Sequence, residues 1–319
     1  MITKNAVWLI TGSSRGLGRA IAETVLEAGY RAVLTARRID QFGDLVAKYA
    51  DAVLVLKLDV TNQDQIDAAI KATTDHFGAV DVLVNNAGYG YLAAIEEGED
   101  VDMRALFETD LFAPINLIKA VLPGMRARLQ GHIVNISSIG GIVTYPGVGY
   151  YHMVKFGLEA MSETLAKEVA GLGIGVTVVA PGAFRTDFRG PDSIKFSATV
   201  IEDYRDTAGK TREATAAGHG KQVGDPTRGA RAIVKAVEAK HPPVHLLIGG
   251  DALDQLRKKL ADVRIETNAW EDVTRSTDFE SQEAARQKDA QPSQMIGASY
   301  SRRGLPSVAR SQEGRFSGC

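Results

Sequence analysis

The chain has 319 residues, a net charge of −2 and a sequence pI near 6.3. This balance gives no electrostatic reason to expect a nucleic acid or an anionic membrane as a partner. The single cysteine, Cys319, excludes an intramolecular disulfide and a cysteine metal site. No apolar run is long enough to span a membrane, and the first residues lack a signal-peptide pattern, so we expect a cytoplasmic protein.

Short apolar runs alternate with segments of helical spacing. The runs that predict buried strands cover residues 6–10, 31–36, 52–60, 80–88, 131–138, 175–182 and 243–250. Helical spacing follows most of them, and two long helices are expected within residues 101–129 and 150–172. This order predicts the α/β class, with a Rossmann-like doubly wound parallel sheet of about seven strands and helices on both faces.

Two segments depart from the alternation. Residues 184–225 are polar, lack a clear apolar period and follow the carboxyl end of a predicted strand. Open α/β sheets bind ligands at such ends, so we expect a substrate lid over about residues 186–220, with a plain surface loop as the alternative. Residues 279–319 are rich in Ser, Gln, Arg and Gly, which predicts a disordered tail after a single domain of residues 1–278.

The stretch TGSSRGLG, residues 11–18, follows the first predicted strand and opens the first predicted helix. Gly12, Gly16 and Gly18 let the backbone turn tightly and approach a phosphate. The helix start offers free N–H groups and the positive end of the helix dipole to an anion. The placement between strand and helix favours a dinucleotide site over a tight turn without a ligand.

A tyrosine and a lysine lie four residues apart in YYHMVK, residues 150–155. Residues i and i+4 share one helix face, so Lys155 can act on the phenol of Tyr151. A free phenol has a pKa of about 10, and a nearby ammonium favours the phenolate and lowers that pKa. A phenol tuned in this way can exchange a proton with a bound substrate as a general acid/base.

Taken together, these motifs resemble the short-chain dehydrogenase/reductase family in its shorter single-domain branch. The glycines follow the spacing TGxxxGxG, NNAG stands at 85–88, Ser138 lies thirteen residues before Tyr151, and PG at 181–182 precedes Thr186. The match covers about residues 5–190. Within the family, the chain is most similar to NADPH-linked carbonyl reductases of the 3-oxoacyl-carrier-protein reductase and 17β-hydroxysteroid dehydrogenase type.

The resemblance implies hydride transfer between a ketone or aldehyde and an alcohol. It assigns catalysis to Ser138, Tyr151 and Lys155. Asp59 and Val60 are expected at the adenine, Asn86 at the adenosine ribose, and Phe184 and Thr186 at the nicotinamide. The full set expected to bind the cofactor is Gly12, Ser14, Arg15, Gly16, Leu17, Gly18, Arg37, Asp59, Val60, Asn86, Ala87, Gly88, Tyr151, Lys155, Pro181, Gly182, Phe184 and Thr186.

Two neighbours are rivals for the catalytic roles. Tyr150 has Val154 at its i+4 position and therefore lacks a cation to tune it. Ser137 points away from Ser138 because side chains alternate along a strand, and the family spacing favours Ser138.

The cofactor preference follows from the end of the second predicted strand. An enzyme that uses NAD commonly has an acidic residue there, but here Ala36 is followed by Arg37 and Arg38. Guanidinium groups suit a 2′-phosphate, and the resemblance gives this role to Arg37, with Arg15 as a second candidate. We therefore predict NADP(H).

One position departs from the family pattern. The helix before the fifth strand usually carries an asparagine in a pattern like ETNLFG, where it supports a water chain to the lysine. Here FETDLF places Asp110 at that position. The added negative charge is expected to raise the pKa of Lys155 and of Tyr151. We expect a proton relay that works with a carboxylate, and weakened activity is the alternative.

The competing functions are a catalytically weak NADP(H)-binding sensor and an epimerase or dehydratase of the same family, which would have TGxxGxxG and a longer substrate domain. The pocket is expected between residues 140–148, 89–93 and the lid, with aromatic area from Tyr89 and Tyr91, and it favours an apolar substrate. The resemblance implies a homodimer or homotetramer formed through the two long helices. No histidine has metal-ligand spacing with carboxylates, so no metal site is expected.

Overall fold

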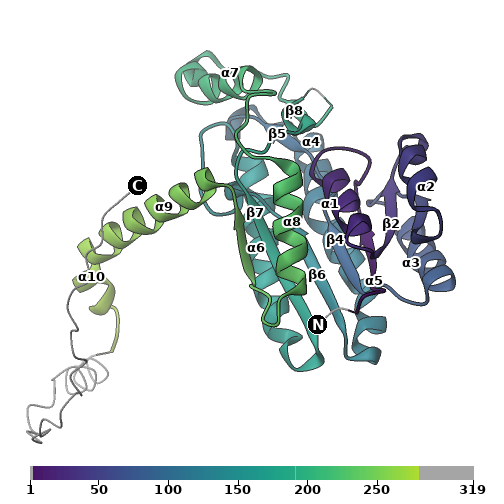
Figure 1. Cartoon of the computed structure of the whole chain (residues 1–319). Helices are drawn as coiled ribbons and strands as arrows, with labels where there is room; N and C mark the ends of the chain where they lie inside the picture. Colours follow the sequence, from purple (N-terminus) through teal and green to yellow (C-terminus); the bar gives the residue numbers. More distant parts are fainter. Residues whose placement is uncertain (1–2, 191, 280–319) are drawn as a thin grey trace, which may run out of the picture. The chain divides into compact units, whose positions relative to one another are not determined.

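The structure is a computed structural model that describes residues 3–190 and 192–279 (Figure 1). The chain divides into two compact units, Met1–Asp262 and Val263–Cys319. The central sheet and the candidate site belong to the first unit. The tail predicted over residues 279–319 lies outside the described residues except for Phe279.

Seven parallel strands form the central sheet in the order β3-β2-β1-β4-β6-β7-β9 (Figure 1). Each coincides with a predicted apolar run, so the predicted doubly wound parallel sheet is confirmed. The strand order reverses between β1 and β4, which marks the point where such sheets bind dinucleotides. The strands are β1 (Val7–Ile10), β2 (Arg31–Ala36), β3 (Val53–Lys57), β4 (Val82–Asn85), β6 (Gly131–Ile136), β7 (Ile174–Pro181) and β9 (His245–Ile248).

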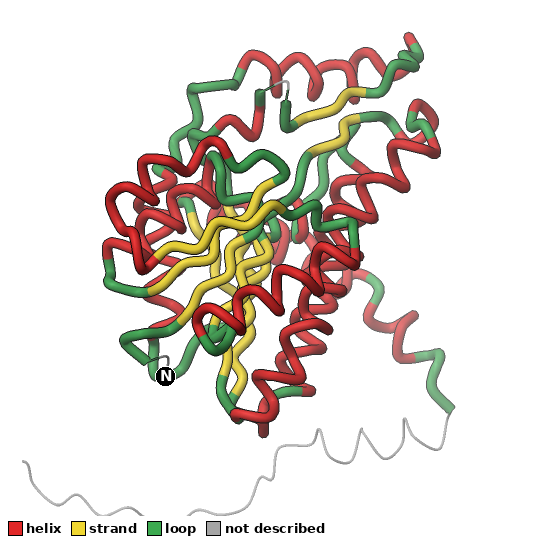
Figure 2. Tube along the Cα trace, turned by 90° about the vertical axis from the view of Figure 1, so that its right-hand side faces the viewer, coloured by secondary structure: helices red, strands yellow, loops and turns green. Residues whose placement is uncertain are grey.

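Helices pack on both faces of this sheet, as Figure 2 shows for the red helices around the yellow strands. Trp8 and Ile10 of β1 point into one apolar core with α1, α2 and α8, while Val7 and Leu9 point into the other with α3, α5 and α6. Strands buried on both faces explain the continuous apolar runs. The bounds are α1 (Gly16–Glu27), α2 (Gly43–Tyr49), α3 (Gln63–Phe77), α5 (Ala113–Arg128), α6 (Gly149–Glu168) and α8 (Pro226–Glu238).

A π-helical turn interrupts the long helix expected within residues 101–129. The segment consists of α4 (Asp100–Phe107), the π turn η4 (Glu108–Phe112) and α5. A π turn holds one more residue than an α turn, and such turns are frequent at functional sites. Here the turn carries Asp110 into the interior, where the residue is 1% exposed.

The region predicted as a lid has its own secondary structure. Its strand β8 (Ile194–Phe196) pairs in parallel with β5 (Gly90–Leu92), away from the central sheet (Figure 1). The remaining elements of this region are η7 (Asp187–Arg189), η8 (Glu202–Tyr204), the π turn η9 (Arg205–Gly209) and α7 (Lys210–Ala217). Short 3-10 turns elsewhere are η1 (Asp40–Phe42), η2 (Ala50–Ala52), η3 (Ile95–Glu97), η5 (Ile139–Gly141) and η6 (Ala170–Leu172).

Two helices follow β9, where the sequence pattern indicated no element. They are α9 (Gly250–Ala269) and α10 (Glu271–Arg275). Among the described residues, no helix is both long and apolar enough to cross a membrane. The same residues contain no group of three or more histidine, cysteine or acidic side chains placed to hold a metal ion.

Candidate active site

A cleft of about 1400 Å³ runs along the carboxyl ends of the strands. It is larger than the roughly 300–1,000 Å³ usual for one small ligand, so it has room for a dinucleotide and a substrate together. Every residue that the sequence predicted for cofactor binding lines this cleft, and so do Ser138, Tyr151 and Lys155. Asp110 is the exception, because it lies behind Lys155 and does not reach the cleft surface.

The glycine loop leaves a cradle that only glycine can form. Gly12 has a φ of +62°, and a Cβ there would lie 2.9 Å from Cα of Ala87. A Cβ on Gly18 would lie 2.3 Å from Nδ2 of Asn86 and 2.6 Å from the carbonyl oxygen of Gly12. The loop therefore packs directly on the NNAG stretch and exposes backbone N–H groups at the start of α1. These features fit a pyrophosphate.

Asn86 braces this loop. Its Nδ2 donates hydrogen bonds to the carbonyl oxygens of Thr11 and Gly12 at 2.9 and 3.1 Å. The expected place of Asn86 beside the end of the fourth strand is what the structure has. Both hydrogen bonds of Nδ2 go to the loop, so Asn86 holds the loop in shape from within the cleft lining.

The far end of the cleft is basic. Arg37 and Arg38 line it beyond Ala36, so no carboxylate stands at the end of β2. Burial raises the pKa of Asp59, but hydrogen bonds from Thr61 and the charge of Arg37 outweigh it and leave this pKa below its ordinary value. Asp59 is therefore an anion close to Arg37.

Arg15 also contacts the lid region. Its Nη2 donates to the carbonyl oxygen of Asp192 at 3.0 Å, and its Nη1 lies 3.5 Å from Oδ2 of the same residue. Arg15 therefore ties the glycine loop to the lid region, and both Arg15 and Arg37 line the cleft.

The predicted catalytic side chains converge from three elements. Ser138 follows β6, Tyr151 and Lys155 share one face of α6, and Asp110 comes from η4. Nζ of Lys155 lies 5.5 Å from the centroid of the Tyr151 ring and 3.1 Å from Oδ2 of Asp110. It also donates a 3.3 Å hydrogen bond to the carbonyl oxygen of Ile136. The lysine is thus held between a phenol and a buried carboxylate.

These charges set the acidity of the phenol. Burial raises the pKa of Tyr151. The Lys155 ammonium and a hydrogen bond with the Ser138 hydroxyl lower this pKa, and the charge of Asp110 raises it again. The net result is a Tyr151 pKa above its ordinary value. Burial lowers the pKa of Lys155, but Asp110 and Tyr151 outweigh it and raise this pKa. Asp110 acts on both groups as expected. The expectation of a lowered Tyr151 pKa was wrong in direction, because burial and Asp110 together exceed the effect of Lys155.

The substrate half of the cleft differs in part from the expectation. Tyr89, Tyr145 and Val148 line it, as do residues of the lid region. Tyr91 does not contribute aromatic area, because it is fully buried and its hydroxyl is hydrogen-bonded to Glu99. Phe188 takes that place, with its ring centroid 6.0 Å from that of Tyr151.

A buried carboxylate in η3 holds the lid region in place. Glu97 is 2% exposed, accepts a 3.0 Å hydrogen bond from the N–H of Ile201 and pairs with Nη2 of Arg212 at 2.6 Å. Burial raises the pKa of Glu97, but hydrogen bonds from Ile201 and Ala94 and the charge of Arg212 leave it lowered. Residues 201–212 are thus held by charge as well as by packing.

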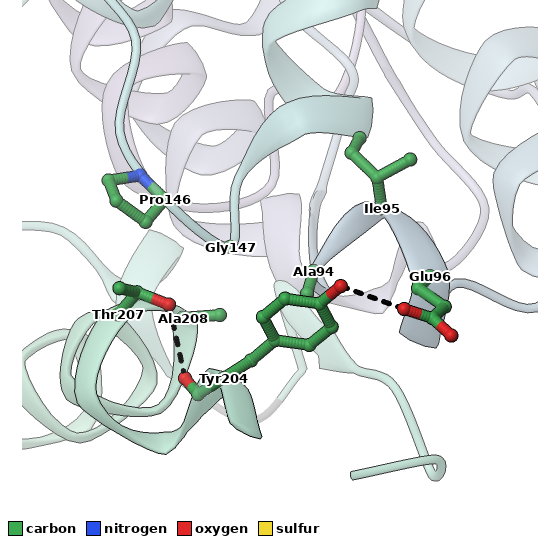
Figure 3. A pocket seen from close by; sticks show the side chains of 8 residues that line it. All are labelled: Ala94, Ile95, Glu96, Pro146, Gly147, Tyr204, Thr207 and Ala208. Carbon is green, nitrogen blue, oxygen red and sulfur yellow. Dashed lines mark hydrogen bonds between the residues drawn. The ribbon is translucent and has the colours of Figure 1, made fainter. Parts of the chain in front are cut away.

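A second cavity, of about 400 Å³, lies beside the cleft, and Pro146 lines both (Figure 3). Figure 3 shows Tyr204 of the lid region pointing toward Glu96, to whose Oε2 its hydroxyl donates a 2.7 Å hydrogen bond. A Cβ on Gly147 would lie 2.9 Å from Cα of Ala208. The segment before α6 and the lid region are therefore in close contact at this cavity.

Sequence reasoning missed His152 and Gln255, which also line the cleft. His152 follows Tyr151 on α6 and contacts the segment after Ser138 through both ring nitrogens. Its position directly beside Tyr151 was the available signal in the sequence. Gln255 lies on α9 and contacts the Tyr145 hydroxyl, and no short-range pattern links these two residues.

Comparison with known proteins agrees with this site. A family model described as short chain dehydrogenase matches residues 6–195. Oxidoreductase BOA17 of Botryotinia fuckeliana is 38% identical over 269 residues, which cover 84% of this chain and 97% of the relative. The 3-oxoacyl-acyl-carrier-protein reductase FabG of Vibrio cholerae is 35% identical over 253 residues, which cover 79% and 96%. A short-chain dehydrogenase structure from Streptomyces avermitilis is 44% identical, with a TM-score of 0.80 and coverage of 86% and 100%.

The chain belongs to the short-chain dehydrogenase family, a family of oxidoreductases with a nicotinamide-dinucleotide-binding fold. Solved members of the fold contain NAD in one case and NADP in another. Family membership therefore leaves the choice of dinucleotide to the residues of each chain.

Proposed function

We propose that the protein is an NADP(H)-dependent reductase and dehydrogenase that interconverts a ketone or aldehyde with an alcohol, with Tyr151 as general acid/base. The observation that carries this proposal is the placement of Ser138, Tyr151 and Lys155 in the same cleft as the glycine loop. The similarity to the 3-oxoacyl-acyl-carrier-protein reductase of Vibrio cholerae supports carbonyl chemistry.

Each side chain has a distinct role in this proposal. When bound, a nicotinamide dinucleotide supplies or accepts the hydride. Tyr151 gives its phenolic proton to the carbonyl oxygen in reduction and takes a proton from the alcohol in oxidation. Ser138 donates a hydrogen bond to the same oxygen, and the Lys155 ammonium stabilises the phenolate that remains on Tyr151.

The basic end of the cleft supports NADP(H) over NAD(H). Arg37 faces the cleft where an NAD-dependent enzyme would place a carboxylate. A guanidinium bound to a phosphate contributes about 1.5–3 kcal/mol, so Arg37→Ala is expected to reduce kcat/KM for NADPH about tenfold to a hundredfold while NADH changes little. Arg231→Ala, on the exposed side of α8, is the control. Equal turnover of the two dinucleotides by the unmodified protein would contradict this preference.

The substrate is expected to be apolar around its carbonyl group. Leu92, Val148 and Phe188 line the half of the cleft that holds Tyr151. A chain-length series of ketones and aldehydes tests this, with rising kcat/KM as apolar carbon is added. A preference for a short, charged carbonyl compound would contradict it.

A catalytically weak dinucleotide-binding sensor is the second candidate. The buried ion pair of Asp110 and Lys155 favours it, because it holds the lysine by a carboxylate where relatives have an asparagine. The intact Ser138, Tyr151 and Lys155 favour the enzyme. Tight NADPH binding without turnover of any compound in a broad carbonyl panel would support the sensor.

We also propose a homodimer or homotetramer that uses the surface of η4 and α6. Phe112, Met153 and Phe156 are 44%, 52% and 41% exposed there, which is unusual for large apolar side chains so close together. Phe156→Glu is expected to lower the mass found by sedimentation velocity. A monomer found for the unmodified protein would refute this assembly.

The decisive experiment follows NADPH absorbance with ketones, aldehydes and quinones, for the unmodified protein and for Tyr151→Phe. Removal of the general acid/base is expected to lower kcat at least a hundredfold, while NADPH binding measured by fluorescence stays within about threefold. Turnover by Tyr151→Phe at the unmodified rate would refute the assignment.

A further inference from the structure

Both imidazole nitrogens of His152 are hydrogen-bonded to the backbone that follows Ser138. Nδ1 lies 2.7 Å from the carbonyl oxygen of Gly140, and Nε2 accepts a 2.9 Å hydrogen bond from the N–H of Tyr145. A carbonyl oxygen only accepts and a backbone N–H only donates. The ring is therefore neutral and carries its proton on Nδ1, and one side chain closes the ends of the segment 140–145.

Gly140 connects this imidazole to the catalytic serine. The N–H of Gly140 donates a 3.0 Å hydrogen bond to Oγ of Ser138. A Cβ on Gly140 would lie 3.1 Å from Nδ1 of His152 and 3.3 Å from Oγ of Ser138, so the glycine is enclosed between the two side chains. His152 fixes the carbonyl group of Gly140 and thereby also restrains the N–H group of Gly140, which is hydrogen-bonded to Ser138.

The same contact decides what the Ser138 hydroxyl can do. Because Oγ accepts from Gly140, its own proton points elsewhere, and the hydroxyl interacts with the Tyr151 phenol. Accepting one hydrogen bond also strengthens the hydroxyl as a donor. A shift of Gly140 would rotate this hydroxyl away from the oxygen that reacts.

We propose that His152, as the neutral Nδ1–H tautomer, is a positioning residue that holds segment 140–145 and through Gly140 aims the Ser138 hydroxyl at the substrate oxygen. The proposal rests on the function proposed above for Ser138. It assigns a role to a side chain that touches neither the reacting atoms nor the glycine loop.

Protonation would break this arrangement. An imidazolium carries a proton on both nitrogens, so Nε2 could no longer accept from Tyr145. His152 is 4% exposed, and burial lowers its pKa below the ordinary value of about 6.5. Among the described residues, the titratable side chain that packs on the His152 ring is Tyr145, with 5.6 Å between the ring centroids. The charge of Asp251 raises the pKa of Tyr145, and the charge of Arg189 lowers it. The segment should therefore loosen only below about pH 6.5.

The test uses NADPH-saturated protein, the best substrate from the carbonyl panel and three variants. His152→Leu removes both hydrogen bonds and is expected to lower kcat about tenfold to a hundredfold, as for a misplaced oxyanion donor. His152→Gln keeps one donor and one acceptor, so kcat within about threefold is expected. His132→Gln is the control, because His132 is equally buried but lies outside the cleft lining.

Two readouts separate positioning from general packing. In the unmodified protein, kcat is expected to fall as the pH drops well below 6.5, and this fall should be absent in His152→Gln and present in His132→Gln. The ¹⁵N chemical shifts of the imidazole report the tautomer without any turnover. They should show Nδ1 protonated and Nε2 unprotonated at pH 7.

The outcomes are distinct. Protonated Nε2 in the NMR spectrum, unchanged kcat in His152→Leu, or equal loss in the Gln and Leu variants would each overturn the proposal. An active Tyr151→Phe would instead refute the proposed function and leave the tautomer result standing. Circular dichroism and NADPH affinity, expected to be unchanged in His152→Leu, show that the variant is folded.

Discussion

The charge of Asp110 should be visible in the pH dependence of alcohol oxidation. In the proposed mechanism, oxidation needs Tyr151 as phenolate, so its rate should rise with pH until the pKa of Tyr151 is passed. The distances of 3.1 Å from Lys155 Nζ to Asp110 and of 5.5 Å from Nζ to the Tyr151 ring together place the carboxylate within about 9 Å of that ring. At an effective dielectric constant of about 20, a unit negative charge at about 9 Å disfavours the phenolate by about 2 kcal/mol, which raises the pKa of Tyr151.

Asp110→Asn removes this negative charge and keeps a hydrogen-bond acceptor for Lys155. The rising limb of kcat/KM for alcohol oxidation is therefore expected about 1 pH unit lower than in the unmodified protein. Asp187→Asn, an exposed acid that lines the same cleft, is the control and should leave the limb in place. A limb that stays where it is, or that moves to higher pH, would refute this account of how Tyr151 is tuned.

Three further predictions concern stability, the lid region and the glycine loop. Burial lowers the pKa of His132 to about 4, so the unfolded chain takes up this proton more readily. About 3 kcal/mol of stability present above pH 6.5 is then lost by pH 4, and urea unfolding should show this loss greatly reduced in His132→Gln. Arg212→Met leaves the buried Glu97 carboxylate without its cationic partner, which should lower the unfolding free energy by about 3 kcal/mol. Proteolysis within residues 197–217 should become faster. Unchanged cleavage would show that this ion pair does not hold the lid region. Gly18→Ala should weaken NADPH binding at least about tenfold by calorimetry, whereas Gly43→Ala, with nothing near its Cβ position, should not.

Short-range patterns were enough to predict the sheet and the cofactor loop. Strands buried on both faces need continuous apolar runs, and a glycine loop between strand and helix needs glycine where the backbone is enclosed. Gly12 and Gly18 meet this need through contacts with Ala87 and Asn86. The four-residue spacing of Tyr151 and Lys155 likewise predicted that these two side chains share one helix face, whereas Ser138 was added by the family resemblance.

Quantities that sum over many neighbours could not be predicted in this way. The four-residue spacing showed that Lys155 would act on Tyr151, but the pKa depends on burial and on Asp110, which lies far away in the sequence. Tyr91 was expected in the pocket but lies in the core, where its hydroxyl donates a hydrogen bond to the Glu99 carboxylate. His152 shows the same limit, since its partners become visible only when the turn after β6 folds back on α6.

The π turn η4 has a consequence for how this protein can vary. Deleting one residue within Glu108–Phe112 would restore regular α-helical geometry, because a π turn accommodates one extra residue within an otherwise continuous helix. The flanking helices would keep nearly the same phase, so Leu106, fully buried on α4, would stay in its core cluster. The bulge that carries Asp110 toward Lys155 would be lost, and the ion pair with it. The length of this segment, and not only its composition, therefore decides whether a buried carboxylate reaches Lys155.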